Sequence, residues 1–487
     1  MKQLTKLFSN GGHCETWAPT KEGRPLKGRL RVISGRKPIE LQLSKRVFLL
    51  YPDEPLDPEK RNANVDWILV DPEQFRSGIG GFVRLRYGEP VLIGRVNDVC
   101  KKALGLSKPV SKRHLAILNQ GDELVLTPLD SEAKTTIAAV TDPDQLGIGL
   151  ERRRRNLDLA CEVLGRPIEL LPPDKALAAV TQVVGILEDE AHRPKDSDGR
   201  PGGVLVLPKK PVPVIVGDLH AQVDNLLKIL SENNFLEEID RGDAYLLFLG
   251  DLLHSEAKDE LAEMDSSLLI MDLFVKLKIR FPKHVFCLRG NHESYDESAG
   301  KAGVPQGLLF RERALRLRGK DYVDELARLF KLLPYVAKTD QFVACHAGPP
   351  RGEVSFQKFV DLSRHRRLAG QLVTNRMVRP NNPFGYTKHN VKRFRANVGV
   401  DKHTPVIVGH THVTPDETVW LNVGEIKQHH VVTCANQHNL AVFVRLGQEM
   451  VPLEYPAEPL LSVVNRASSK HGGQKRKRSK QKAEAHH

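Results

Sequence analysis

The sequence predicts an α/β (α+β) fold for its larger, C-terminal part, preceded by an all-β sandwich and a helical linker. Two observations predict it. Apolar strand-like runs that end in Gly, Asp, Asn or His recur between residues 206 and 458, with helix-like stretches between them. Short strands separated by turns fill residues 65–148. The chain of 487 residues has room for about two to four domains. We therefore divide it into segments 1–64, 65–148, 149–205, 206–458 and 459–487.

Composition narrows the class of protein. No apolar run approaches the roughly 18 residues that a membrane span needs, and residues 1–8 lack the apolar core of a signal peptide. The six cysteines are scattered and form no Cys-x-x-Cys pair. We therefore expect reduced structural thiols, a cytoplasmic location and no membrane partner.

Charge is concentrated at the end of the chain. The net charge is +13, and residues 459–487 form a Lys/Arg-rich, low-complexity tail that we expect to be disordered. One hypothesis is that the tail contacts nucleic acid or another polyanion. The other is that it is a solvated, solubilising tail. Residues 1–64 contain short strand-like pieces at 30–33 and 47–50, to which the sequence assigns no role.

Five predicted strands end in polar residues suited to metal binding. They lie at 214–216, 245–249, 285–288, 342–345 and 406–408, and are followed by Gly217-Asp218-Leu219-His220, Gly250-Asp251, Arg289-Gly290-Asn291-His292-Glu293, His346-Ala347-Gly348 and Gly409-His410-Thr411-His412. Open α/β sheets place their sites at the carboxyl ends of their strands. Polar residues that merely satisfy a strand end would explain one such run, but five favour a two-metal site.

This ordered set resembles the calcineurin-like metallophosphoesterases over residues 206–455. The strings Arg-Gly-Asn-His-Glu and His-Ala-Gly are most similar to the phosphoprotein (Ser/Thr) phosphatase branch, whereas Gly-His-x-His is the general superfamily form. The resemblance implies a four-layer β-sandwich flanked by helices. It also implies a role for each matching residue: Asp218, His220 and His412 hold a first metal, Asp251 bridges, Asn291, His346 and His410 hold a second, and His292 protonates the leaving oxygen.

The implied chemistry needs such a set. Two divalent cations about 3.5–4 Å apart neutralise phosphate oxygens and activate water. Mixed His, Asp and Asn ligands suit Mn²⁺, Fe or Zn²⁺ better than Ca²⁺ or Mg²⁺. An alkoxide leaving group needs an acid, and imidazole titrates near neutral pH.

The second motif departs from the phosphatase pattern. There the family has Gly-Asp-x-x-Asp-Arg-Gly, and this chain has His254 in place of the Asp that orients the catalytic His and Ser255 in place of the Arg that binds phosphate. We hypothesise that His254 or Glu256 orients His292. The candidates to replace the lost Arg are Arg289, Arg376 and Arg379.

Residues 65–148 resemble a forkhead-associated domain. The matching strings are Gly94-Arg95 and Ser111-x-x-His114, in a run of predicted strands at 82–87, 90–95, 110–117 and 123–126. The resemblance implies that Arg95 and Ser111, with Arg113 nearby, hold a phosphothreonine peptide. The family's Asn-Gly is absent, so a sandwich without peptide binding remains an alternative.

Helix-like patterns complete the chain, over residues 150–190, 223–230 and 265–278. In the last of these, Leu268, Met271, Phe274 and Val275 recur at helical spacing, which predicts a core face. The leading functional hypothesis is a metal-dependent phosphomonoesterase that resembles Ser/Thr protein phosphatases. The alternatives are a nucleotide, dinucleotide or phosphodiester hydrolase, and a phosphopeptide-binding adaptor with weak catalysis.

Overall fold

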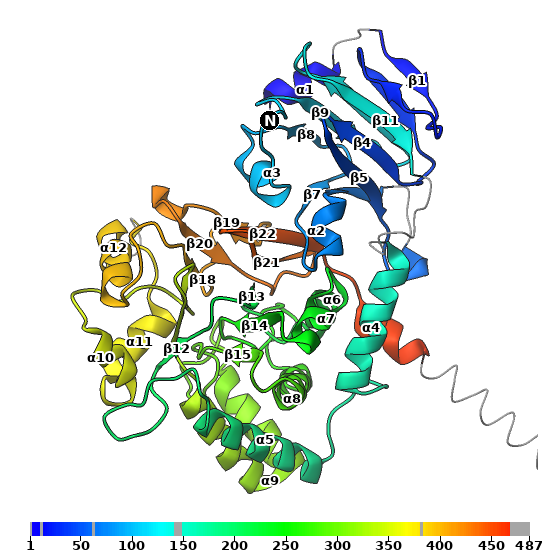
Figure 1. Cartoon of the computed structure of the whole chain (residues 1–487). Helices are drawn as coiled ribbons and strands as arrows, with labels where there is room; N and C mark the ends of the chain where they lie inside the picture. The colour runs from blue at the N-terminus through cyan, green and yellow to red at the C-terminus, as the bar shows by residue number, and fades with distance from the viewer. Residues whose placement is uncertain (1, 10–12, 61–63, 141–148, 380–382, 468–487) are drawn as a thin grey trace, which may run out of the picture. The chain divides into compact units, whose positions relative to one another are not determined.

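The computed structural model describes residues 2–9, 13–60, 64–140, 149–379 and 383–467 (Figure 1). The chain divides into two compact units. The N-terminal unit comprises residues 1–157 and 231–235, and the C-terminal unit comprises residues 158–230 and 236–487. Residues 468–487, which hold most of the expected basic tail, lie outside the described part.

The N-terminal unit contains two β-sheets. Within the described residues the first has five strands, in the order β1 (Glu15–Trp17), β3 (Leu30–Ile33), β10 (Glu123–Pro128), β9 (Leu115–Asn119) and β8 (Pro90–Ile93). The second has six, in the order β2 (Arg24–Pro25), β11 (Thr135–Ala139), β4 (Ile39–Leu43), β5 (Arg46–Asp53), β6 (Asp66–Val70) and β7 (Phe82–Leu85). Short helices α1 (Lys2–Ser9), α2 (Pro72–Arg76) and α3 (Asp98–Ala103) accompany them.

Both sheets draw on residues from either side of position 64. The expected division between residues 64 and 65 lies between β5 and β6, which are antiparallel neighbours. Asn119 ties the sheets together, because its buried carboxamide donates to the carbonyls of Val65 and Leu85. The strand expected at 110–117 begins only at Leu115. Residues 110–114 form a loop instead, because their backbone turns to bond with Arg95 and with the His114 ring.

The C-terminal unit also contains two sheets, both mixed. In the described residues one runs β15 (Val285–Cys287), β14 (Ala244–Phe248), β13 (Val212–Val216), β21 (Asn439–Leu446) and β22 (Glu449–Pro456). The other runs β12 (Val204–Val206), β16 (Val336–Lys338), β17 (Val343–Cys345), β18 (Val406–Val408), β20 (His429–Val432) and β19 (Val419–Trp420). The five predicted motif strands correspond to β13, β14, β15, β17 and β18.

An apolar core fills the space between these two sheets. Ile215, Leu247 and Phe286 from one sheet belong to the same buried cluster as Ala344 and Ile407 from the other. The β-branched and aromatic runs of the sequence pack here because a strand buried on both faces has no polar side.

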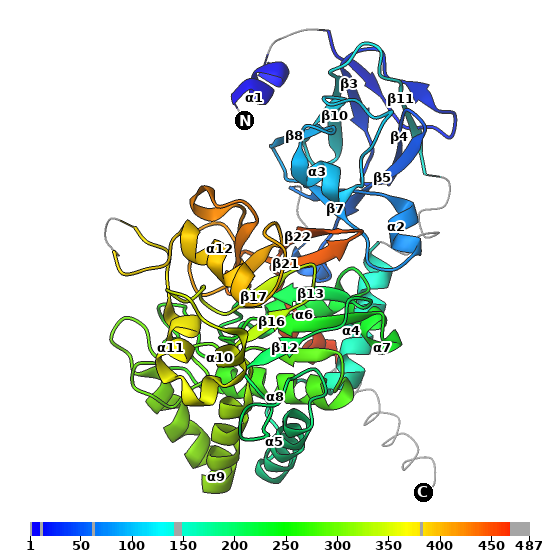
Figure 2. The same ribbon diagram turned by 60° about the vertical axis from the view of Figure 1, so that its left-hand side comes forward.

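Helices cover the outer faces of both sheets (Figure 2). A second core cluster joins β17, β18 and β20 to α10 (Phe356–Val360), α11 (Arg366–Thr374) and α12 (Lys388–Asn397). Helix α8 (Asp265–Arg280) packs beside β15 and contacts α5 (Pro173–Glu188) and α9 (Gln306–Leu332), and α6 (Val223–Ser231) and α7 (Phe235–Arg241) precede β14. The core face predicted for α8 is confirmed, since its four apolar residues are buried.

The helical pattern expected over residues 150–190 comprises two helices. Helix α4 (Leu150–Leu164) ends at Gly165, whose φ of 97° is left-handed, and α5 begins after Pro172. Glycine adopts this conformation without cost, which explains the break. No helix in the described part of the chain is both long and apolar enough to cross a membrane. All six cysteines lie in that part and are free thiols.

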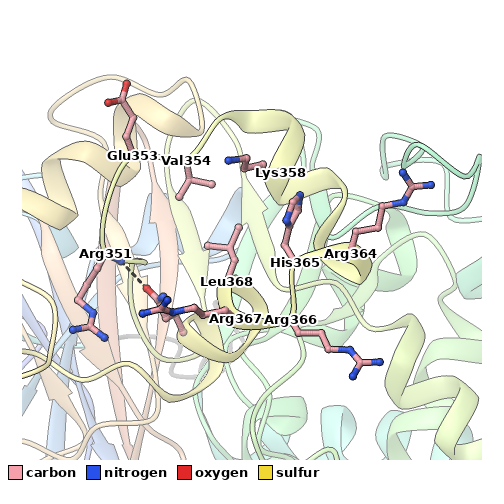
Figure 3. A pocket seen from close by; sticks show the side chains of 10 residues that line it. Arg351, Glu353, Val354, Lys358, Arg364, His365, Arg366, Arg367 and Leu368 are labelled. Atoms are coloured by element: carbon pink, nitrogen blue, oxygen red, sulfur yellow. Dashed lines mark hydrogen bonds between the residues drawn. The ribbon is translucent and has the colours of Figure 1, made fainter.

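A basic cavity of about 670 Å³ opens beside α10 and α11 (Figure 3). Its lining includes Arg351, Lys358, Arg366 and Arg367, with Glu353 as its one carboxylate among the described residues. The backbone N–H of Arg351 donates to Gln371 at 2.8 Å and fixes one wall. The cavity offers positive charge and no group of metal-ligating side chains.

Candidate metal centre

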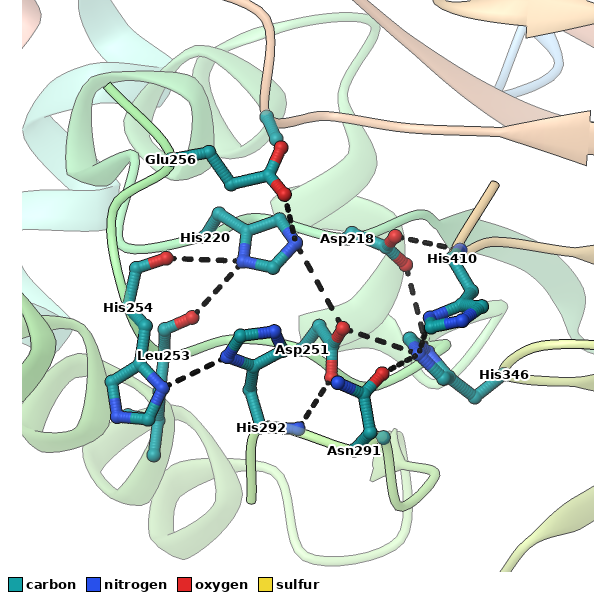
Figure 4. Close-up of polar contacts among 12 residues, drawn as sticks. Asp218, His220, Asp251, Leu253, His254, Glu256, Asn291, His292, His346 and His410 are labelled. Carbon is teal, nitrogen blue, oxygen red and sulfur yellow. Dashed lines mark hydrogen bonds and ion pairs between the residues drawn. The ribbon is translucent and has the colours of Figure 1, made fainter. Parts of the chain in front are cut away.

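Polar side chains that follow five strands meet in one buried cluster (Figure 4). Three of these strands, β13, β14 and β15, belong to one sheet, and β17 and β18 belong to the other. The structure thus brings together six of the seven predicted ligands: Asp218, His220, Asp251, Asn291, His346 and His410. Each of the six lies within four residues of the end of a buried strand, which is the pattern that the sequence shows.

Asp251 lies at the centre of the cluster. Its Oδ2 is 3.2 Å from His346 Nε2 and 3.8 Å from His220 Nε2, while its Oδ1 accepts a hydrogen bond from the backbone N–H of His292 at 2.9 Å. Two groups of ligand atoms, each within 4.8 Å of one another, both contain Asp251: one with His220 and His292, the other with His346 and His410. A carboxylate shared in this way can serve two cations.

The group around His346 presents acceptors to a common point. Nδ1 of His346 lies 3.1 Å from the carbonyl of Leu249, so in the neutral ring Nδ1 carries the proton and Nε2 presents its lone pair. That Nε2 is 3.1 Å from Asn291 Oδ1 and 3.2 Å from His410 Nδ1. As placed, the Asn291 oxygen faces only acceptors, and turning the carboxamide over would put its nitrogen there instead. A cation between these atoms favours the oxygen-inward orientation, as a metal ligand requires.

The group around His220 also presents acceptor atoms to a common point. Nδ1 of His220 faces the carbonyls of Leu253 and His254 at 3.2 and 3.0 Å, so it must be the donor. Its Nε2 lone pair therefore points toward the carboxylates of Asp251 and Glu256, at 3.8 and 3.6 Å. In the described part of the chain, the buried Oδ1 of Asp218 has no hydrogen-bond partner. Unpaired acceptors of this kind fit a divalent cation held by nitrogen and oxygen ligands.

Strained backbone accompanies the cluster. His220, Asp251, His254 and His410 all adopt left-handed φ values, of 44°, 51°, 68° and 62°. Such conformations cost non-glycine residues about 1–3 kcal/mol each and persist where the surrounding structure imposes them. At these residues the backbone turns sharply in the loops that follow the strands, and this turn directs the side chains into the cluster.

Two glycines allow close packing against the carboxylates. A Cβ at Gly290 would lie 2.1 Å from Asp251 Oδ1, and one at Gly409 would lie 2.1 Å from Asp218 Oδ1. Neither position has room for a side chain. These glycines therefore belong to the geometry of the centre, although they supply no ligand.

Glu293 braces the turn that carries Asp251. Its buried carboxylate accepts hydrogen bonds from the backbone N–H groups of Asp251, Leu252 and Gly290, at 2.9, 2.8 and 2.8 Å. Sequence reasoning quoted Glu293 as part of a motif and gave it no role. The only signal in the sequence for this role was the position of Glu293 after His292. Two of the three donors come from a segment about 40 residues away, and the third lies across a turn.

Burial and crowding shift the pKa values of the cluster. Burial raises the pKa of Asp218 to about 7, against the opposing effect of His346. Burial would lower the pKa of His346, but the carboxylates of Asp251 and Asp218 raise it to about 9. Burial and the neighbouring His346 hold the pKa of His410 well below its usual range. Charges concentrated out of water in this way are typical of functional sites.

His292 lies beside the cluster and contacts His254. The Nδ1 atoms of the two rings are 2.9 Å apart. Of the two residues we expected to orient His292, His254 makes this contact, whereas Glu256 turns toward His220. Burial and the nearby His292 lower the pKa of His254 to about 3, so His254 is neutral near pH 7.

His412, the seventh predicted ligand, lies at the rim. Its Nε2 is 3.3 Å from Glu256 Oε2, and it belongs to neither compact ligand group. Contact with Glu256 raises the pKa of His412. The structure therefore links His412 to the centre through Glu256.

The candidate phosphate-binding arginines have different surroundings. Arg289 donates to the carbonyl of Phe330 at 3.1 Å and lies over the Tyr335 ring. Arg376 is exposed and close enough to His410 to lower the pKa of that residue. Arg379 is half-buried on the same segment. Sequence reasoning did not single out Lys301, whose Nζ lies 2.6 Å from Glu256 Oε1.

The predicted phosphopeptide residues belong to the N-terminal unit. Arg95 donates through Nε to the carbonyl of Val110 at 2.6 Å, and its backbone N–H donates to Ser111. The His114 ring accepts from the Ser111 backbone and contacts Thr135 Oγ1 at 3.1 Å. Arg113, two residues after Ser111, is exposed.

Comparison with known proteins identifies the central part of the chain. Residues 213–414 match the family model of calcineurin-like phosphoesterases, and this part is a calcineurin-like metallophosphoesterase domain. The match spans every strand end of the cluster, including those that carry His410 and His412.

Curated relatives are serine/threonine phosphatases at low identity. The protein phosphatase PP1-delta of Caenorhabditis elegans is 34% identical over 88 residues, which are 18% of this chain and 25% of that protein. The PP2A-like phosphatase PPG1 of Candida albicans is 27% identical over 197 residues, which are 40% of each. The chain spans less than half the length of these relatives. A solved protein serine/threonine phosphatase from Saccharomyces cerevisiae, titled as similar to human PP5, is 15% identical with a TM-score of 0.44, covering 59% of this chain and 91% of that chain.

Proposed function

We propose that the calcineurin-like metallophosphoesterase domain of this chain hydrolyses phosphate monoesters, with phosphorylated serine or threonine side chains of proteins as substrates. The convergence of His, Asp and Asn side chains from five strand ends carries this proposal. The phosphatase relatives support the choice of substrate class.

The donor set suits two divalent cations, of which Mn²⁺, Fe and Zn²⁺ fit best. Asp218, His220 and His412 would hold the first, Asn291, His346 and His410 the second, and Asp251 both. When bound, such a pair supplies neutralisation of the phosphate oxygens and activation of water. The chain contributes a fixed orientation of two ligating imidazoles, since backbone carbonyls hold the Nδ1 atoms of His220 and His346.

His292 is placed to handle the proton of the leaving group. Its backbone N–H is anchored to Asp251, and its Nδ1 contacts the neutral His254. These two contacts leave Nε2 directed into the centre, beside the Asn291 carboxamide. A protonated His292 would donate Nδ1–H to His254 and deliver the Nε2 proton to the leaving alkoxide.

The candidates to replace the missing phosphate-binding arginine are other arginines and one lysine. Arg376 and Lys301 lie near His410 and Glu256 respectively, so either can place positive charge beside a bound phosphate. Arg379 is on the same segment as Arg376 and stays a candidate. The guanidinium of Arg289 is engaged by Phe330 and Tyr335, which makes it the weakest of the four.

The N-terminal unit would act as a forkhead-associated-like module that selects phosphothreonine partners. Its two sheets and the loop that joins Arg95, Ser111 and His114 support this assignment. Within this proposal, residues 149–205 link the module to the catalytic domain at 206–458, and the tail contacts polyanions.

Hydrolysis of p-nitrophenyl phosphate by the Mn²⁺-loaded full chain tests the catalytic proposal. We expect His292→Ala to lower kcat by about 100-fold or more, as the loss of a general acid does, and Asp251→Asn to abolish activity. The exposed His438→Ala serves as the control. Undiminished activity in His292→Ala would remove the acid role, and an inactive wild-type chain would remove the function.

A substrate panel separates the alternatives. Phosphoserine and phosphothreonine peptides, bis-p-nitrophenyl phosphate and a dinucleotide should be compared by kcat/KM. Preference for the diester or the dinucleotide would replace the protein phosphatase assignment. Binding of a phosphothreonine peptide should survive Asp251→Asn and be lost in Arg95→Ala, with Arg31→Ala as the control. No measurable peptide affinity in the wild type would reject the binding module.

A further inference from the structure

Glu256 lies between two imidazoles that the centre needs for its first cation. Its Oε1 is 3.6 Å from His220 Nε2 (Figure 4). Its Oε2 is 3.3 Å from His412 Nε2. The residue belongs to the loop after β14, at a position where the related phosphatase motif has glycine. No role in the centre follows from that motif, so the carboxylate is an addition relative to it.

Acceptor atoms of His220, Asp251 and Glu256 face one another here, and they repel one another unless a positive charge lies between them. His220 must keep its proton on Nδ1, because two carbonyls lie 3.0–3.2 Å from that atom. Its Nε2 lone pair therefore faces the oxygens of Glu256 and Asp251. Among the described residues, the buried Nε2 of His412 makes no aligned hydrogen bond. Acceptors that converge from three side chains need a cation.

We propose that Glu256 is a further ligand of the first metal, and that it draws His412 into the coordination sphere from the rim. This inference rests on the proposed two-metal function. A hard carboxylate oxygen beside imidazole nitrogens suits Mn²⁺ and Fe. With Asp218 and Asp251, Glu256 gives the centre three carboxylates, which balance much of the charge of two divalent cations.

Lys301 competes for the same carboxylate. Its Nζ is 2.6 Å from Glu256 Oε1, the oxygen that faces His220. An ammonium group satisfies the carboxylate when no metal is bound, and a metal at this oxygen must share or displace it. Removal of Lys301 should therefore tighten the first site.

Metal titration of the full chain tests the proposal without relying on activity. Chelator-stripped protein is titrated with Mn²⁺ alone by calorimetry, and bound Mn²⁺ is counted by mass spectrometry. We expect two Mn²⁺ per wild-type chain. Glu256→Gln should lose one of them or bind it at least 10-fold more weakly, and Lys301→Met should bind it more tightly.

The matched control is Glu260→Gln. Glu260 is an exposed carboxylate of the same loop that contacts Ser255 Oγ at 2.8 Å and not the centre. It should retain both Mn²⁺ with wild-type affinity. Circular dichroism of each variant shows whether the fold is retained.

Three results would overturn the inference. Two Mn²⁺ bound by Glu256→Gln with unchanged affinity would show that the carboxylate is no ligand. Tighter binding by that variant would show that Glu256 excludes metal instead of holding it. A wild-type chain that binds no Mn²⁺, Fe or Zn²⁺ would remove the two-metal function itself, and this inference with it.

Discussion

The Nδ1 atoms of His254 and His292 are 2.9 Å apart, so one imidazole orients the other where related phosphatases use a carboxylate. Burial keeps His254 neutral. A neutral partner stabilises a protonated His292 less than an anionic partner does, because it offers a dipole in place of a charge. This relationship fixes the orientation of the proposed acid.

His254→Asp should move the high-pH limb of the kcat profile upward by about one pH unit, since an anionic neighbour favours the imidazolium. His254→Ala should lower kcat about 10-fold, the value of one orienting hydrogen bond, and change KM little. Profiles of kcat and KM from pH 5 to 9 check both. An unshifted limb in His254→Asp would mean that His292 does not act as the acid.

Gly290→Ala should weaken metal binding although it removes no ligand, because the new Cβ would lie 2.1 Å from Asp251 Oδ1. We expect the affinity for Mn²⁺ to fall at least about 10-fold by calorimetry, the equivalent of about 1.4 kcal/mol. Gly370→Ala is the matched control. Its Cβ would meet nothing within 4 Å, and its position in helix α11 tolerates alanine. Equal affinity in both variants would contradict the steric argument.

Glu293→Ala should destabilise the C-terminal unit by about 3 kcal/mol or more. Three buried backbone donors lose their acceptor, and each unsatisfied group costs about 1–3 kcal/mol. Urea unfolding gives the free energy, and the exposed Glu297→Ala provides the comparison. A change under about 0.5 kcal/mol, as for an ordinary surface substitution, would show that Glu293 is not a brace.

His429 should make stability fall in mild acid. It is buried, its Nε2 is 2.9 Å from the Tyr386 hydroxyl, and burial lowers its pKa from 6.5 to about 4. The folded state therefore keeps His429 neutral while the unfolded state takes up a proton below pH 6.5. The contribution is fully present above pH 6.5 and is lost progressively toward pH 4, by up to about 3 kcal/mol.

Unfolding free energies at pH 7, 6 and 5 test this pH dependence. His429→Gln should show a shallower decline than the wild type, because the titrating group is gone. The exposed His438→Gln should decline like the wild type. Parallel curves for wild type and His429→Gln would exclude His429 as the cause.

The residues that the structure brings together at the centre could be read from the sequence because the pattern that marks them is local. Asp218, Asp251 and His346 each end an apolar run, so the strand end and the ligand are read together. Contacts between side chains from distant segments could not be predicted from the sequence. Nothing near Glu256 in the sequence shows that it turns to His220 while His254 turns to His292. The members of those pairs are 36 and 38 residues apart in the sequence. The path of the loop after β14 brings them into contact.

In the N-terminal unit, local sequence patterns predicted some strands and missed the start of another. The strands predicted at 82–87 and 90–95 are observed at Phe82–Leu85 and Pro90–Ile93, yet residues 110–114 were also assigned to a strand and form a loop. Four of these five residues are polar, and a hydrogen bond from the backbone N–H of Ser111 to Nδ1 of His114 holds a loop there. The strands before residue 64 had weak patterns of their own, and only their pairing with later strands shows where they belong.

The ligand donors are divided between two sheets, since Asp218, Asp251 and Asn291 follow strands of one and His346 and His410 follow strands of the other. Neither sheet alone carries the full set. The full ligand set would therefore exist only when the two sheets are packed on each other, and bound cations would stabilise that packing. Chelation should for that reason lower the free energy of unfolding of the C-terminal unit.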